Sequence, residues 1–372
     1  METTKKFKII NVSSKFGICG MPLRADTYKS CSFGCKYCFS NNRKVMGNNC
    51  GFAVGDIKHL ERLFKKVFDD QKVDNTNFLE VLLSQHYPLH CGGMSDPFQP
   101  CEEKYGITAQ LVDLSNKYRV PIVFSTKSDT VYGAKINPDL HTFQLSVSNM
   151  KNYNNLEPNV PSFEKRARFY DELKAKGFKV GIRIQPFIPG VTEPEIIDRF
   201  KDADNITIES IKLVPQNPER REELRKMIGL KKEDFYYFGL ANIKPEIKLE
   251  YYQPILDKIF QYRLPFSVAD NDLRWIGTNK CCCGDRLVPK FTSFNITTMM
   301  KTHKGVYDLA DVIDAAEEDG VLPCKCKPLF ASNRQPGVDT VEDFLRHNFN
   351  NKKSPMCPDL QHYISSKNTT KN

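Results

Sequence analysis

The stretch Lys29–Arg43 reads KSCSFGCKYCFSNNR and holds three cysteines, Cys31, Cys35 and Cys38, in the spacing C-x3-C-x2-C. Thiolates at such short gaps can converge on one zinc ion or on one iron–sulfur cluster. A cubane cluster normally takes four cysteines, so three cysteines leave one iron open to an external ligand. An open position is typical of a catalytic centre, whereas a closed shell is typical of a structural one. The alternative is a zinc site whose fourth ligand lies elsewhere in the chain.

Strand-like and helix-like segments alternate after this loop. Strands are expected at 88–93, 121–128, 142–148, 178–188, 205–214 and 264–270, and helices at 56–70, 102–118, 161–177 and 193–203. Such alternation predicts βα units around a parallel sheet. We therefore expect an α/β fold, a partial (β/α)6 TIM-like barrel whose active site lies at the carboxyl ends of the strands.

Three further motifs follow the cysteine loop in order. They are GGMSDPFQPCEEKYGIT at 92–108, IVFSTKS at 122–128, and a helix, strand and Pro-Gly turn at 157–193. CSFGCKYC at 31–38 resembles the signature of the radical S-adenosylmethionine (radical SAM) enzymes. The later motifs resemble the spore photoproduct lyase-like branch of that superfamily, and the resemblance covers roughly residues 20 to 270.

This resemblance implies a cofactor pair and a reaction. In the family, S-adenosylmethionine is the missing ligand: it binds the open iron of a 4Fe-4S cluster through its amino and carboxylate groups. Its reductive cleavage yields a 5′-deoxyadenosyl radical, which abstracts a hydrogen atom from the substrate. A flavodoxin- or ferredoxin-like electron donor is implied as a partner. Lyase, transferase and oxidoreductase chemistry all remain open.

The resemblance also assigns roles by position. It implies Tyr37 or Phe39 for the adenine, Gly92 and Gly93 for the methionine amino group, Ser125 and Lys127 for the ribose or carboxylate, Ser146 and Ser148 for the same pocket, Arg183 for the carboxylate, and Ile188 and Gly190 for the adenine wall. Asp96 either supports the amino group or caps a turn. Cys91 and Cys101 are candidate hydrogen donors to a product radical, or else buried structural thiols.

A second group of cysteines follows residue 280. It comprises Cys281, Cys282, Cys283, Cys324, Cys326 and Cys357. These thiols are numerous enough for a second iron–sulfur cluster or a structural zinc, with unliganded thiols as the alternative. Because the βα rhythm ends nearby, we expect an N-terminal basic segment at 1–20, the radical SAM partial barrel at 21–270 and a cysteine-rich C-terminal extension at 271–372.

The charge of the chain is unevenly placed. The net charge is +9, and residues 1–45 alone hold nine Lys or Arg against two Asp or Glu, a balance of +7. A basic patch favours a polyanionic partner, so we expect DNA or RNA as the substrate, with repair and base modification both open. Two alternatives remain: a radical SAM enzyme acting on a peptide or small molecule, and a zinc-stabilised, non-catalytic nucleic-acid-binding protein.

The expected compartment is the cytoplasm. No apolar run approaches the roughly 18 residues that span a bilayer, and the start METTKKFKII carries no secretory pattern. Thirteen cysteines in a reducing compartment indicate metal binding or catalysis rather than a disulfide framework.

Overall fold

The computed structural model describes most of the first 291 residues and a few later ones. The described residues are 4–13, 19–42, 51–151, 155–213, 218–238, 240–279, 281–289, 291, 337–340, 342–343 and 346–347. Cys324, Cys326 and Cys357 lie outside them. Among the described helices, none is long and apolar enough to cross a membrane.

An eight-stranded sheet forms the centre, in the order β13-β9-β8-β7-β6-β5-β3-β2. Its strands are β2 (Ile10–Val12), β3 (Leu23–Ala25), β5 (Leu89–Cys91), β6 (Ile122–Thr126), β7 (His141–Ser146), β8 (Val180–Phe187), β9 (Asn205–Ser210) and β13 (Phe266–Val268). Every neighbouring pair is parallel except β2 with β3. From β3 to β13 each strand lies beside its predecessor in the sheet. This singly wound order is that of a barrel and confirms the expected partial barrel.

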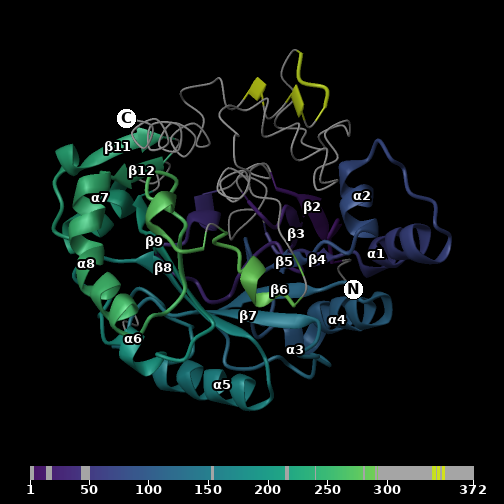
Figure 1. Cartoon of the computed structure of the whole chain (residues 1–372), viewed down its shortest axis with the longest axis horizontal. Helices are drawn as coiled ribbons and strands as arrows, with labels where there is room; N and C mark the ends of the chain where they lie inside the picture. The colour runs from purple at the N-terminus through teal and green to yellow at the C-terminus, as the bar shows by residue number, and fades with distance from the viewer. Residues whose placement is uncertain are drawn as a thin grey trace, which may run out of the picture.

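The helices gather on one side of this sheet. They are α1 (Ile57–Phe64, continued by a π-helical turn at Lys65–Asp69), α2 (Phe78–Ser84), α3 (Glu102–Tyr105), α4 (Ile107–Tyr118), α5 (Phe163–Ala175), α6 (Ile196–Arg199), α7 (Pro218–Met227) and α8 (Pro245–Gln261). Right-handed crossovers that all progress in one direction put their helices on one face. Figure 1 shows α4, α3, α5, α6 and α8 as an arc around the outside of the curved sheet.

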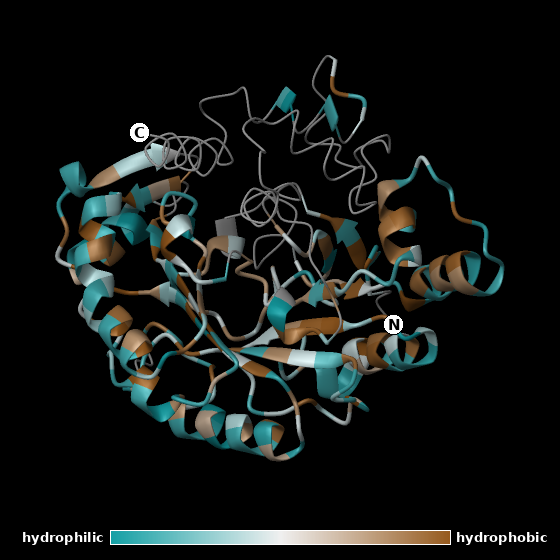
Figure 2. Ribbon diagram, viewed as in Figure 1, coloured by the Kyte–Doolittle hydropathy of each residue, from teal (hydrophilic) through white to brown (hydrophobic). Residues whose placement is uncertain are grey.

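The hydrophobic core lies between the sheet and this arc. Outward-facing strand residues such as Leu89, Phe124, Phe143 and Ile182 are at most 1% exposed. The helices turn apolar faces to the sheet and hydrophilic faces outward (Figure 2). Such a fully buried parallel sheet needs apolar side chains on its helix-covered face, which is why these strands read as near-continuous hydrophobic runs.

Two smaller sheets complete the described part of the fold. β1 (Lys6–Phe7) pairs in parallel with β4 (Val54–Gly55). β10 (Lys212–Leu213), β12 (Leu240–Ile243) and β11 (Phe235–Phe238) form an antiparallel sheet. Short 3-10 turns lie at Phe39–Asn42, Lys232–Asp234, Arg274–Ile276 and Asp285–Leu287.

Some elements differ from the expected ones. The helix expected at 102–118 breaks at Gly106, whose φ of 57° is left-handed and ends α3 before α4 begins. The strand expected at 205–214 divides into β9 and β10, which belong to different sheets. β3, α2, α7, α8 and the antiparallel sheet were not expected. β3 has only three residues and carries Arg24 at its centre, so it shows no apolar run.

Candidate active site

The cysteine loop follows β3 and is held by side chains from the later motifs. Gln99 clamps it from one side, accepting from the N–H of Ser32 and donating to the carbonyl of Ser30, both at 2.8 Å. Asn159 donates to the carbonyl of Ser32 at 2.9 Å. Gly34 has a φ of 65°, which a residue with a side chain adopts only at a cost. The loop is therefore fixed by three contacts to segments that lie far away in sequence.

The thiols of this loop lie in an apolar setting. Cys35 is buried, and Cys31 and Cys38 are half-buried against a cluster that includes Phe33 and Ile188. Burial raises the pKa of the Cys31 and Cys35 thiols to about 12. Thiols in such surroundings stay protonated unless a metal binds them. The donor set therefore fits a metal centre that is shielded from water.

The three loop thiols are not arranged as ligands of one ion. In the described part of the chain, no three His, Cys, Asp or Glu side chains surround a single point as metal ligands. A cubane cluster needs no such point, because each of its cysteines binds a different iron. The loop is thus compatible with such a cluster.

A buried ion pair supports the predicted adenine residue Tyr37. The Tyr37 hydroxyl donates to the carboxylate of Glu157, which forms an ion pair with Arg166 at 3.3 Å. Arg166 also donates to the carbonyl of Ser146 at 2.8 Å, at the end of β7. The Lys127 ammonium lies 5.8 Å from the centre of the Tyr37 ring. Glu157 and Arg166 were not predicted from the sequence. They tie the cysteine loop to the strand ends.

Asp96 acts as a turn cap in this structure. Its carboxylate accepts from the N–H groups of Phe98 at 3.0 Å and Lys127 at 2.7 Å, and from the Thr126 hydroxyl at 2.7 Å. These contacts join the loop after β5 to the end of β6, as the turn interpretation predicts. Burial raises the pKa of its carboxyl group. The predicted contact of Asp96 with the methionine amino group stays a prediction.

Several predicted cofactor positions line the carboxyl ends of the strands. Gly92 has a φ of 96°, and a Cβ there would lie 2.1 Å from the carbonyl oxygen of Ser125. Asn149 Nδ2, just beyond β7, is buried without a hydrogen-bond partner among the described residues, whereas the Ser148 side chain hydrogen-bonds to Tyr37. Unpaired buried polar atoms are costly and point to a missing ligand. The strand ends therefore fit a polar cofactor such as S-adenosylmethionine.

The remaining predicted residues lie in different surroundings. Ile188 is fully buried beside Cys35 and Tyr37, as an adenine wall requires, whereas Phe39 is 36% exposed and Gly190 lies in an exposed turn. Gly93 lies near the guanidinium of Arg24. Cys91 is buried in the core between sheet and helices, and the half-buried Cys101 precedes α3. The hydrogen-donor role of Cys91 or Cys101 stays a prediction.

The concave face of the sheet carries a chain of polar side chains, one from each parallel strand. They are Arg24, His90, Ser125, Gln144, Arg183, Thr207 and Ser267, which we call the concave row. Hydrogen bonds link them from β3 to β9. Arg24 contacts His90, whose Nε2 lies 2.7 Å from Ser125 Oγ. Gln144 accepts from Ser125 at 3.2 Å and from Arg183 at 2.8 Å, and donates to Thr207 at 3.3 Å.

The first late cysteines lie against this row. The carbonyl of Cys282 accepts from Arg183 at 2.9 Å and from Gln144 at 3.1 Å, and that of Cys281 accepts from Ser267 at 3.1 Å. Arg183, predicted for a cofactor carboxylate, donates from Nη1 to a backbone carbonyl here, and its role toward the cofactor stays a prediction. The start of the C-terminal extension is thus inserted into the concave face, and not only packed over it.

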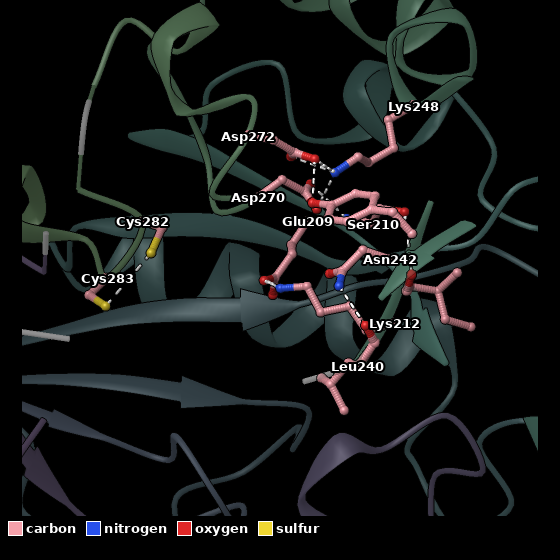
Figure 3. Close-up of polar contacts among 12 residues, drawn as sticks. Glu209, Ser210, Lys212, Leu240, Asn242, Lys248, Asp270, Asp272, Cys282 and Cys283 are labelled. Atoms are coloured by element: carbon pink, nitrogen blue, oxygen red, sulfur yellow. Dashed lines mark hydrogen bonds and ion pairs between the residues drawn. The ribbon is translucent and has the colours of Figure 1, made fainter. Parts of the chain in front are cut away.

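A buried charge network lies where β9 and β13 end. Lys248 of α8 donates to Asp272 at 2.5 and 2.7 Å and to Asp270 at 3.3 Å, and both Lys248 and Asp270 side chains are only 2% exposed (Figure 3). Asp270 also accepts from the hydroxyl of Tyr252 at 2.6 Å. Glu209 and Lys212 form a further pair in the same view. No spacing of residues in the sequence predicted this network.

Known proteins were compared with the chain as a whole. No family model matches it, and no curated protein sequence matches it. Solved structures do match. A point variant of spore photoproduct lyase superposes with a TM-score of 0.53 at 14% identity, over 71% of this chain and 80% of that one. Spore photoproduct lyase complexed with dinucleoside spore photoproduct gives 0.51 at 14% identity, over 69% and 78%. The chain therefore shares the fold of spore photoproduct lyase.

A third structure adds the cofactor. A spore photoproduct lyase variant with bound AdoMet and dinucleoside spore photoproduct gives a TM-score of 0.50 at 15% identity, over 68% of this chain and 78% of that one. The resemblance seen in the motifs is thereby confirmed for the fold. In this fold the cysteine loop Cys31–Cys38 leads away from the carboxyl end of β3, where barrel active sites are built.

Proposed function

We propose that the chain is a radical SAM enzyme. Cys31, Cys35 and Cys38 would hold a 4Fe-4S cluster, and S-adenosylmethionine would bind at its open iron. The observation that carries the proposal is the three-cysteine loop, clamped by Gln99 at the carboxyl end of a spore photoproduct lyase-like sheet. Together, the cluster and cofactor would supply a 5′-deoxyadenosyl radical for hydrogen abstraction when reduced by a flavodoxin- or ferredoxin-like donor in the cytoplasm.

The residues of the chain would position and shield this centre. Phe33 and Ile188 keep water from the thiols, because both are buried against Cys35. Asn149 Nδ2 offers a buried hydrogen-bonding group to the bound cofactor. Burial raises the pKa of Cys35, and Lys127 brings a positive charge beside Tyr37 that opposes this rise and would favour the bound thiolate.

We further propose that the substrate is a nucleic acid. The support is the balance of +7 over residues 1–45 and the dinucleoside photoproduct bound by two of the structural neighbours. A base flipped out of its strand is a suitable size for the mouth of a barrel. Repair and base modification follow equally from this support. A peptide or small-molecule substrate, and a non-catalytic zinc protein, remain the alternatives that the experiments below separate.

Cofactor cleavage tests the enzymatic part. The full chain, reconstituted with iron and sulfide without oxygen, is incubated with dithionite and S-adenosylmethionine, and 5′-deoxyadenosine is measured by mass spectrometry. We expect product from the wild type and none above background from Cys35→Ala. Thr76→Ala, at an exposed loop position, should match the wild type. A folded, iron-loaded wild type that forms no 5′-deoxyadenosine would overturn the proposal.

Salt dependence tests the substrate class. Binding of a fluorescent DNA or RNA oligonucleotide is measured between low and physiological ionic strength. Each phosphate contact should contribute a slope of about −0.7 to −0.9 in log K against log salt, so several contacts weaken binding steeply. Cofactor cleavage without any oligonucleotide binding would leave the radical enzyme in place and remove the nucleic acid as substrate.

A further inference from the structure

The described structure brings together a second group of thiols, away from the cysteine loop. Cys283 Sγ lies 3.4 Å from Cys19 Sγ and 3.9 Å from Cys282 Sγ, and the Cys281 side chain also hydrogen-bonds to Cys283. Cys19 and Cys283 are 264 residues apart in sequence. Cys283 therefore has three sulfur neighbours, drawn from both ends of the barrel domain.

These separations match one kind of metal site. An ion bound tetrahedrally by four thiolates at about 2.3 Å sets its sulfur atoms about 3.8 Å apart. The two sulfur–sulfur distances in this structure, 3.4 and 3.9 Å, lie on either side of this expected separation. Thiolates of a cubane cluster bind different irons and stand farther apart, so a second cubane fits less well. We propose that Cys19, Cys281, Cys282 and Cys283 bind a single zinc ion on the concave face of the sheet.

The backbone of the thiol loop is already fixed for this task. Ser267, Gln144 and Arg183 of the concave row hold the carbonyls of Cys281 and Cys282 at 2.9 to 3.1 Å. Partners of this kind orient metal ligands and are part of a metal site. In the described chain no three ligand side chains surround one point, so binding of the ion requires the thiol side chains to rotate on this held backbone.

The charge around the thiols suits a thiolate-rich ion. Four thiolates and one Zn²⁺ carry a net charge of about −2. Arg24 donates to Cys283 Sγ at 3.4 Å and to Cys19 Sγ at 3.5 Å, and the Arg183 guanidinium lies against the Cys282 carbonyl. Two guanidinium groups thus face the group of sulfurs. The site is also dry, because Cys19, Cys281 and Cys283 are at most 4% exposed.

This zinc would staple the two ends of the barrel domain. Cys19 precedes β3, the first of the parallel strands in the sheet order. Cys281–Cys283 follow β13, the last of them. A structural ion here closes the open side of a sheet whose first and last parallel strands are not hydrogen-bonded to each other. The site is separate from the cysteine loop, so its occupancy does not depend on radical chemistry.

Metal content of variants tests the proposal. Zinc is measured by mass spectrometry in the full chain purified from zinc-supplemented cells. We expect about one zinc per chain in the wild type and a loss of at least about fivefold in Cys19→Ser and in Cys283→Ser. Cys101→Ser, a half-buried cysteine before α3, should keep its zinc, and so should Cys31→Ala/Cys35→Ala/Cys38→Ala. Zinc retained in both Cys19→Ser and Cys283→Ser would overturn the site.

A measurement on the wild type covers the case in which those variants do not fold. Titration with a mercurial reagent should release zinc to a colorimetric chelator as the thiols react. Replacement by Co²⁺ should give the visible bands of a tetrahedral cobalt thiolate. Release of zinc without thiol titration, or an octahedral cobalt spectrum, would contradict the thiolate shell. Iron lost in Cys19→Ser and Cys283→Ser instead of zinc would overturn the choice of metal.

Discussion

Arg183 of β8 donates a hydrogen bond from Nη1 to the carbonyl oxygen of Cys282 at 2.9 Å. The same nitrogen donates to Gln144 at 2.8 Å, so one side chain joins the sheet to the segment that follows the barrel. Hydrogen bonds from charged groups contribute about 1.5 to 3 kcal/mol each. Arg183→Met should lower the free energy of unfolding by about 2 kcal/mol, measured by chemical denaturation. Arg168→Met, on the exposed face of α5, should change it little. Equal losses in the two variants would contradict this role.

Gly92 is required by both its backbone and its surroundings. Its φ is 96°, and a Cβ would lie 2.1 Å from the Ser125 carbonyl oxygen and 2.9 Å from Pro97. We expect Gly92→Ala to lower the free energy of unfolding by more than about 3 kcal/mol. Gly190→Ala is the matched control: its φ is 74°, but no described atom lies within 4 Å, so about 1 kcal/mol is expected. Thermal unfolding of both variants measures the two losses. A Gly92→Ala protein as stable as Gly190→Ala would contradict the predicted clash of a Cβ at position 92 with Ser125 and Pro97.

Lys248 should be among the most sensitive lysines of the described chain. It is 2% exposed and neutralises Asp270 and Asp272, which would be left as unpaired buried charges in Lys248→Met. Breaking a buried pair in this way costs about 3 to 5 kcal/mol. Lys258→Met removes the half-exposed pair with Asp198 and should cost under about 1 kcal/mol. Denaturant midpoints of the two variants measure the difference between their stability losses. Equal losses would show that the network is solvated and would contradict the prediction.

Burial of His141 should make the free energy of unfolding depend on pH in a defined way. Its Nδ1 accepts the N–H of Asn137 at 2.8 Å, and burial lowers its pKa from 6.5 to about 4. Between these values the unfolded chain binds the additional proton, so stability is lost as the pH falls from about 6.5 to about 4. His141→Gln lacks this contribution. The stability advantage of the wild type over the variant should therefore shrink by up to about 3 kcal/mol across that window. Because His90 is present in both proteins, its own titration cancels, and a constant difference would contradict the assignment.

The sequence predicted the parallel strands and the cysteine loop because both leave local signals. Buried strands such as Ile122–Thr126 are continuous apolar runs, and the gaps between Cys31, Cys35 and Cys38 are short. The helix at 161–177 was confirmed in place, with Ser162 capping it and Gly177 beyond its end at a φ of 82°. Asp96 could be predicted as a turn residue because Asp before Pro favours a turn.

Contacts between distant residues left no such signal. Cys19 and Cys283 meet only because the segment after β13 crosses the concave face, and three adjacent cysteines have no spacing to interpret. Lys248 looks like a surface residue of a helix until the loop after β13 covers it. Of the concave row, only Ser125 and Arg183 were predicted as site residues. The others were missed because they are single polar residues inside apolar strands, and only the register aligns them.

Iron and acid-labile sulfide content tests the central claim most directly. The full chain and Cys31→Ala/Cys35→Ala/Cys38→Ala are reconstituted without oxygen and freed of unbound metal. The account predicts about four iron and four sulfide per wild-type chain, none bound in the triple variant, and a changed electron paramagnetic resonance spectrum of the reduced cluster when S-adenosylmethionine is added. Iron that persists in the triple variant, or a spectrum that ignores S-adenosylmethionine, would contradict it.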